Sequence, residues 1–175
     1  ISGLGDWQEP LADFLKKDTM KNIFKYLKDE YSKGVCYPPK NQIFNAFQKC
    51  KFSNLKAVIV GQDPYIKQNE AMGLCFSIPK TTKCPPSLVN IYKALVKDPK
   101  ITFTMPSPLH GDLSNWASQG VLMLNASLTV QAGKSNSHKD CRWLKFTQAV
   151  IDLINKEKSG ISFLVWGKYA DKICA

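Results

Sequence analysis

The sequence predicts an α/β protein with an open, mainly parallel sheet flanked by helices on both faces. Three short apolar runs, 57–60, 121–124 and 161–166, are continuous rather than alternating, which is typical of strands buried on both faces. Stretches with a helical spacing of apolar residues separate these runs. Because strands that alternate with helices form open α/β sheets, the two observations together indicate this class.

The helical stretches can be placed from their apolar spacing. A broken 3.6-residue spacing over 11–29 predicts one or two helices, which end before the Tyr-Pro-Pro run at 37–39. A short helix is expected around residues 43–47. Longer helices are expected at 87–96, between the first two strands, and at 143–155, between the second and the third.

Length and charge narrow the classes of function. At 175 residues, the chain is expected to form a single domain over 1–175. No apolar run approaches the ~20 residues of a membrane helix, and no signal peptide is visible, so neither a membrane partner nor secretion is expected. The net charge of +10 favours a polyanion, nucleic acid first. Arg142 is the only arginine, so guanidinium readout of guanines is not the main recognition mode.

Ligands of open α/β sheets bind beyond the carboxyl ends of the strands, which selects 61–65, 125–127 and 167–169. The sequence lacks G-x-G-x-x-G and G-x-x-x-x-G-K-[ST], which disfavours nucleotide-hydrolysing and dinucleotide enzymes. No cysteine pair has C-x-x-C spacing and the two histidines are far apart, so we expect free buried thiols and no metal site.

Several motifs follow one another along the chain: Gly-Gln-Asp-Pro-Tyr at 61–65, Gly-Leu-Cys-Phe-Ser at 73–77, a proline-rich loop and helix at 85–92, and the segments 111–125, 136–138 and 166–167. In this order they resemble the motifs of the family 1 uracil-DNA glycosylases, which the chain resembles from about residue 4 to its end. The resemblance implies a four-stranded sheet and no cofactor. It implies a monofunctional repair enzyme that flips uracil out of DNA, hydrolyses its N-glycosidic bond and leaves an abasic site.

The resemblance also implies roles for single residues in the pocket. Asp63 would position or deprotonate the attacking water. Asn125 would accept from N3–H and donate to O4 of uracil, a pattern that cytosine does not match. The ring of Tyr65 would exclude the methyl group of thymine, and Phe76 would stack on the flipped base. Gln62 would contact the edge of the base.

A second set of residues is implied for the DNA backbone: Pro85, Pro86, Ser87, His138, Gly167 and Lys168. Ser87 is interpreted as the N-cap of the following helix, whose free N–H groups would face a phosphate. For His138, a phosphate contact and a structural role supporting the pocket both remain open.

The sequence departs from the family in several places. Ile66 and Met72 stand where the family usually has histidine, and Lys168 stands where it has a small residue. The family's fourth strand and the following His-Pro-Ser-Pro-Leu-Ser segment, which supplies an anion-stabilising histidine and a leucine wedge, have no counterpart; 106–109 imitates the segment but is out of order. We therefore expect a domain that is incomplete at its C-terminus, and a 175-residue form that is impaired.

Two functions remain open: a uracil-DNA glycosylase, or a catalytically weak or inactive DNA-binding module on the same scaffold. Ile66 and the missing segment favour the module, whereas Asp63 and Asn125 favour the enzyme. The expected partners are single- and double-stranded DNA containing uracil and a protein inhibitor at the DNA groove, with a monomeric protein. The nucleus, a DNA-containing organelle and, for a bacterial or viral protein, the cytoplasm are all compatible locations.

Overall fold

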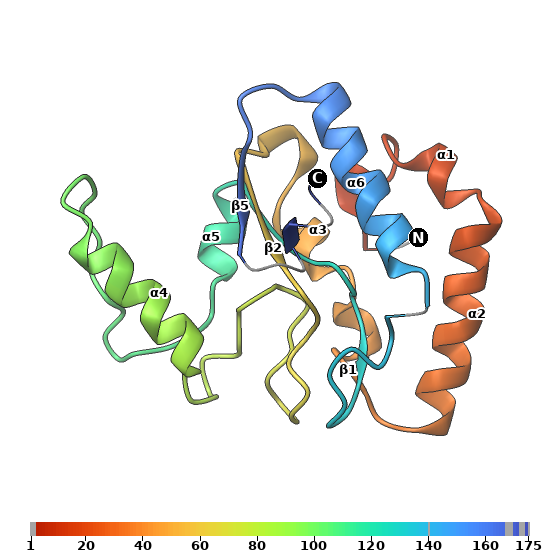
Figure 1. Ribbon diagram of the computed structural model, residues 1–175, viewed down its shortest axis with the longest axis horizontal. Helices are drawn as coiled ribbons and strands as arrows, with labels where there is room; N and C mark the ends of the chain where they lie inside the picture. Colours follow the sequence, from red (N-terminus) through yellow and green to blue (C-terminus); the bar gives the residue numbers. More distant parts are fainter. Residues whose placement is uncertain (1–2, 140, 167–169, 172–173, 175) are drawn as a thin grey trace.

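A three-stranded parallel sheet forms the centre of the fold in the computed structural model, which describes residues 3–139, 141–166, 170–171 and 174 (Figure 1). Its strands are β2 (Ala57–Gly61), β3 (Val121–Asn125) and β5 (Ser162–Val165), in the spatial order β3-β2-β5. Both pairings are parallel, so the predicted fold class is confirmed. The fourth parallel strand expected from the family is not found among the described residues.

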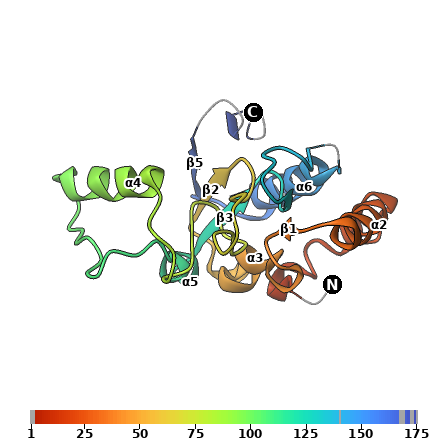
Figure 2. The same cartoon turned by 90° about the horizontal axis from the view of Figure 1, so that it is seen from below.

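Helices lie on both sides of the sheet. On one side lies α6 (Trp143–Glu157), with α2 (Asp18–Lys33) outside it, and on the other lie α4 (Pro86–Lys97) and α5 (Ser114–Ser118), as Figures 1 and 2 show. The helical pattern over 11–29 resolves into the short α1 (Ala12–Leu15) and α2. The short helix expected near 43–47 is α3 (Asn45–Lys49).

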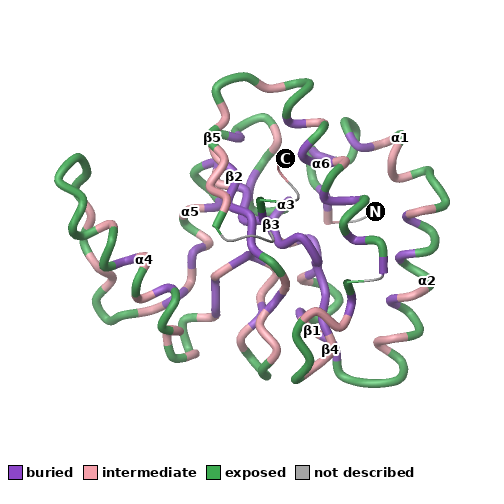
Figure 3. The backbone as a smooth tube through the Cα atoms, in the orientation of Figure 1, coloured by how far each residue is buried: buried purple, intermediate pink, exposed green. Residues whose placement is uncertain are grey.

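The core lies between the sheet, α3 and α6. Figure 3 shows buried residues along β2 and β3 and mostly half-buried or exposed residues in α4. Trp143 and Phe146 of α6 pack edge-on against Phe44 and Phe47 around α3. This aromatic packing fastens α6 against the segment that leads into the first parallel strand.

The third strand differs from its prediction. The run 161–166 was expected to be buried on both faces, but β5 is exposed at Ser162 and only half-buried over the rest of its length. The reason is that β5 lies at an edge of the described sheet, and α4 stands away from it in Figures 1 and 2. An open apolar groove of about 610 Å³ separates them, lined among others by Ile91, Leu95 and Leu164.

Smaller elements, which the apolar pattern does not predict, complete the fold. The strands β1 (Cys36–Tyr37) and β4 (Val130–Gln131) pair antiparallel. Single 3₁₀ turns lie at Gly5–Trp7, Lys40–Gln42 and Phe52–Asn54. Within the described ranges, none of the helices combines the length and the apolar character that crossing a membrane requires.

Candidate functional site

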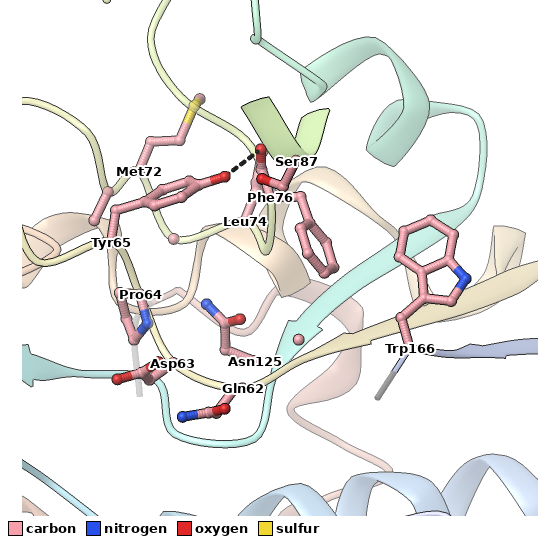
Figure 4. A pocket seen from close by; sticks show the side chains of 13 residues that line it. Gln62, Asp63, Pro64, Tyr65, Met72, Leu74, Phe76, Ser87, Asn125 and Trp166 are labelled. Atoms are coloured by element: carbon pink, nitrogen blue, oxygen red, sulfur yellow. Dashed lines mark hydrogen bonds between the residues drawn. The ribbon is translucent and has the colours of Figure 1, made fainter. Parts of the chain in front are cut away.

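A small pocket opens at the carboxyl ends of the parallel strands, where the sequence predicts ligand binding (Figure 4). Its volume is about 280 Å³, at the low end for ligand pockets and suited to a single small ring. It is lined by Gly61, Gln62, Asp63, Pro64, Tyr65, Ala71, Met72, Gly73, Leu74, Phe76, Ser87, Asn125 and Trp166. The five residues predicted as catalytic or base-contacting are therefore brought together around one cavity.

Asn125 lies at the bottom of this pocket, where the register of β2 and β3 places it. It lies opposite Gly61 in the β2–β3 pairing, and the ladder continues past both strands through Ala126 N–H to Gly61 O, at 2.9 Å, and Ser127 N–H to Gln62 O, at 3.0 Å. The side chain is almost fully buried. An amide in this position offers one donor and one acceptor to a ligand ring.

Asp63 lies at the rim, half-buried, and its carboxylate is held from a distant segment. The Ser135 hydroxyl donates to Oδ2 across 3.0 Å, and the backbone N–H of Asn136 donates to the same oxygen across 2.7 Å. Gln62 joins this contact, because its Nε2 donates to Oδ1 of Asn136 at 2.7 Å. A carboxylate held at a pocket rim can orient or deprotonate a water molecule there.

The aromatic residues form the opposite wall. Figure 4 shows Tyr65 and Phe76 facing the same space as Asn125. The hydroxyl of Tyr65 donates to the backbone oxygen of Phe76 at 3.2 Å. Burial raises the pKa of the Tyr65 phenol to about 12, with the Ser87 hydroxyl opposing this, so the ring is neutral at physiological pH. Phe76 itself has a positive φ of 61°, a left-handed conformation that turns its ring into the site.

Five further side chains line the pocket and were not among the predicted site residues: Pro64, Ala71, Met72, Leu74 and Trp166. The ring of Trp166 meets Phe76 edge-on, with centroids 5.3 Å apart. Met72 is anchored by its backbone oxygen, which accepts from Asn45 Nδ2 at 2.8 Å. The sequence could have indicated these residues through their closeness to the recognised motifs. Trp166, for example, directly follows the third strand.

The proline-rich loop brings Ser87 to the pocket, but not as a helix cap. The helix α4 begins at Pro86, with Pro85 as its N-cap and no side-chain cap bond, so the prediction that Ser87 is the N-cap is wrong. Proline has no N–H to lose and a helical φ, which favours it at the first helical position. Beside the loop, an open groove of about 660 Å³ is lined by Pro85, Pro86 and three lysines, Lys67, Lys83 and Lys93.

His138 lies inside the protein, fully buried. Its Nδ1 is 2.8 Å from the Thr129 hydroxyl, and its Nε2 is 3.5 Å from Oε2 of Glu30. Desolvation lowers the pKa of the imidazole, although Glu30 opposes this. A phosphate contact does not fit this placement, because the ring has no access to solvent; the structural alternative does fit.

Gly167 and Lys168, which were predicted to contact the DNA backbone, lie outside the described residues. Within the described part of the chain, no group of three or more His, Cys, Asp or Glu side chains is arranged to hold a metal ion. Cys36, Cys50, Cys75 and Cys141 are buried, as expected, whereas Cys84 and Cys174 are only half-buried.

Comparisons with known proteins agree on one family. The model of the uracil DNA glycosylase superfamily matches residues 47–175. The chain is 48% identical over 170 residues to a uracil-DNA glycosylase of Campylobacter jejuni subsp. doylei, covering 94% of this chain and 70% of that protein. It is 43% identical to the uracil-DNA glycosylase of Christiangramia forsetii, covering 95% of this chain and 73% of the relative.

Solved structures agree with the sequence relatives. Mimivirus uracil-DNA glycosylase superimposes with a TM-score of 0.88 at 30% identity, covering 97% of this chain and 62% of the viral one. A variant of mimivirus UNG in complex with UGI has a TM-score of 0.86 at 29% identity, covering 97% and 64%. The chain thus spans somewhat less than two thirds of these viral chains. The family match over most of the chain and the close relatives together show that this chain belongs to the uracil DNA glycosylase superfamily.

Proposed function

We propose that the protein is a family 1 uracil-DNA glycosylase, which hydrolyses the N-glycosidic bond between uracil and deoxyribose in DNA and leaves an abasic site. The observation that carries the proposal is the convergence of Asp63, Asn125, Phe76 and Tyr65 on one cavity the size of a single ring. The Gly-Gln-Asp-Pro-Tyr motif at 61–65 supports the finer assignment to family 1. An inactive DNA-binding module is not favoured, because binding alone needs neither Asp63 nor Asn125.

Asp63 activates the water in this proposal. Cleavage of the bond produces an oxocarbenium-like sugar and a uracil anion. A carboxylate beside the sugar favours the cation and orients a water molecule on its far face. Support comes from its position at the rim, where Oδ2 is held by Ser135 and Asn136.

Asn125 reads the base. Its carbonyl oxygen accepts from N3–H and its amide donates to O4, whereas cytosine would set an acceptor against the oxygen and an amino group against the NH₂. Because Asn125 is almost fully buried, such a mismatch leaves polar groups without partners. Discrimination of this kind can reach about 10⁴-fold.

The aromatic wall completes selectivity. Phe76 stacks on the flipped base, and the ring of Tyr65 occupies the space that the C5 methyl of thymine would need. Support for a rigid Tyr65 comes from its hydrogen bond to the backbone oxygen of Phe76. Gln62 contacts the base edge or orients the neighbouring turn.

DNA is held through its phosphates. The net charge of +10 and the lysine-lined groove beside Pro85 and Pro86 support a path for the backbone along this side of the pocket. Binding should therefore weaken steeply with salt, while the preference for uracil over cytosine should not. A protein inhibitor at the same groove is part of the proposal; a mimivirus relative is known in complex with UGI.

Uracil release tests the proposal. The protein expressed from its complete gene is incubated with a single-stranded oligonucleotide carrying one deoxyuridine, and abasic sites are counted after alkaline cleavage. Release that falls by roughly 10³-fold or more in Asp63→Asn supports the enzyme. Tight DNA binding without release by the wild type would support the binding module instead.

A further inference from the structure

The catalytic carboxylate is held by two donors that converge on one of its oxygens. Ser135 Oγ lies 3.0 Å and Asn136 N lies 2.7 Å from Oδ2 of Asp63, across more than 70 residues of sequence. Among the described residues, the side-chain hydrogen bonds of Asp63 all end on Oδ2. The other oxygen, Oδ1, keeps its lone pairs for a ligand or a water molecule.

The turn that supplies these donors is firmly built. The backbone N–H of Gln131 donates to the Ser137 hydroxyl at 2.7 Å, and a β-bridge joins Gln131 to Lys134. On the far side, His138 is buried against Thr129. The residues on either side of Ser135 and Asn136 are thus tied down, so the two donors have a defined position relative to β2.

We propose that Ser135 is a positioning residue for Asp63: with the N–H of Asn136 it holds Oδ2 and thereby aims Oδ1 at the attacking water. The inference rests on the proposed function. A carboxylate rotates readily about its last bond, since that torsion is broad. Two donors on one oxygen restrict this rotation. The carboxylate is therefore already oriented before the reaction begins, and the entropy cost of orienting it in the transition state is smaller.

Ser135 is the part of this arrangement that a substitution can remove. The Asn136 donor is a backbone group, which every residue except proline supplies, whereas the Ser135 hydroxyl disappears in Ser135→Ala. The side chain is exposed, so loss of the hydroxyl leaves no buried group without a partner. The loss should therefore act on the carboxylate and not on the stability of the fold.

The molecule contains a matched control away from the pocket. Ser53 donates its hydroxyl to Oδ2 of Asp6 at 2.9 Å, and its own backbone N–H donates to the same oxygen at 3.0 Å. The pair of donors on one aspartate oxygen is the same, but neither residue lines the pocket. Ser53→Ala thus removes an equivalent bond without reaching the site.

The test measures kcat and KM for uracil release with the wild type, Ser135→Ala, Ser135→Thr and Ser53→Ala. We expect Ser135→Ala to lower kcat by roughly tenfold with KM and DNA affinity unchanged, because the bond orients a group used in the transition state. Ser135→Thr keeps a hydroxyl and should restore most of kcat. Ser53→Ala should leave both parameters unchanged.

A double-mutant cycle shows whether Ser135 acts through Asp63. In single-turnover measurements with Asp63→Asn, adding Ser135→Ala should cause no further loss, because the amide leaves no carboxylate to aim. An unchanged kcat in Ser135→Ala, or an equal loss in both backgrounds, would overturn the assignment while the proposed function stands. A wild type that releases no uracil would overturn both.

Discussion

Gly61 and Asn125 are register partners at the ends of neighbouring parallel strands, and Oδ1 of Asn125 lies in the space that a Cβ atom on residue 61 would need. The Cβ atom of Cys75 would also lie 2.9 Å from it. Glycine is thus required here by close approach of a side chain, not by an unusual backbone angle. The first residue of the Gly-Gln-Asp-Pro-Tyr motif therefore sets where the Asn125 amide lies.

Gly61→Ala should displace the Asn125 amide. Neither neighbour can yield freely, since Asn125 is almost fully buried and Cys75 is fully packed. Overpacking of this kind costs about 1–3 kcal/mol, and the amide is shifted from its hydrogen-bonding position. We expect kcat/KM for uracil release to fall by at least roughly tenfold.

Gly34→Ala is the matched control for this substitution. A Cβ atom at position 34 would meet nothing within 4 Å, and the backbone there is extended, with φ at −171°. Its activity should equal that of the wild type. Equal activities of Gly61→Ala and Gly34→Ala would show that Asn125 is not confined by Gly61.

Asn125→Asp should weaken selectivity for uracil. A carboxylate cannot donate to O4 of uracil, but it can accept from the amino group of cytosine. The ratio of uracil to cytosine release should fall by at least roughly 100-fold, measured on otherwise identical oligonucleotides. Asn54→Asp, at an exposed amide that reaches the Ser118 backbone oxygen at 3.5 Å, should keep the ratio. An undiminished ratio in Asn125→Asp would contradict the assignment.

Tyr65→Ala should admit thymine. Removing the ring relieves a clash with the C5 methyl group worth about 1–3 kcal/mol, so the ratio of thymine to uracil release should rise by roughly ten- to a hundredfold. Tyr65→Phe keeps the ring and loses only the bond to the Phe76 backbone oxygen, so it should still exclude thymine. Release of thymine by neither variant would mean that another group excludes the methyl.

Acid should remove one contribution to stability at Asp6. Desolvation, the largest single influence, raises the pKa of this carboxyl, but hydrogen bonds from Ser53 and Phe52 together outweigh it and lower the pKa below its ordinary 3.8. A lowered folded-state pKa stabilises the fold above the unfolded-state pKa, and this contribution is lost as pH falls through the folded-state pKa. The loss should therefore occur below about pH 4.

Asp6→Asn tests this in urea denaturation. Because the Asp6 carboxylate is exposed and screened by solvent, the variant should lose only about 0.5 kcal/mol of unfolding free energy at pH 7, and the difference from the wild type should shrink below about pH 4. Asp18→Asn, which removes an exposed ion pair with Lys21, should change stability little at either pH. A difference for Asp6→Asn that stays constant down to pH 2 would contradict the prediction.

Much of the fold follows from local patterns. The three parallel strands could be placed because burial on both faces leaves an uninterrupted apolar run, and α6 because its apolar residues recur at helical spacing. The two-residue strands β1 and β4 carry too few residues for any periodicity. The five-residue α5 was also missed.

The site divides in a similar way. The residues of 61–65, Phe76 and Asn125 could be proposed because they stand in recognisable motifs at strand ends. The positions of Ser87 and His138 could not, because each depends on packing: one on a helix that starts at Pro86, the other on a polar cluster with Glu30 and Thr129 inside the protein.

By itself, the sequence determined which segments line the pocket and in what order they follow the strands, since strand runs and motifs are local properties. Only the tertiary structure decided that Ser135 and Asn136 hold Asp63, and that Asn125 fills the space beside Gly61. The physical reason is that these contacts join residues more than 60 positions apart. Their geometry is set by strand register and by the packing of one turn, neither of which leaves a periodic trace along the chain.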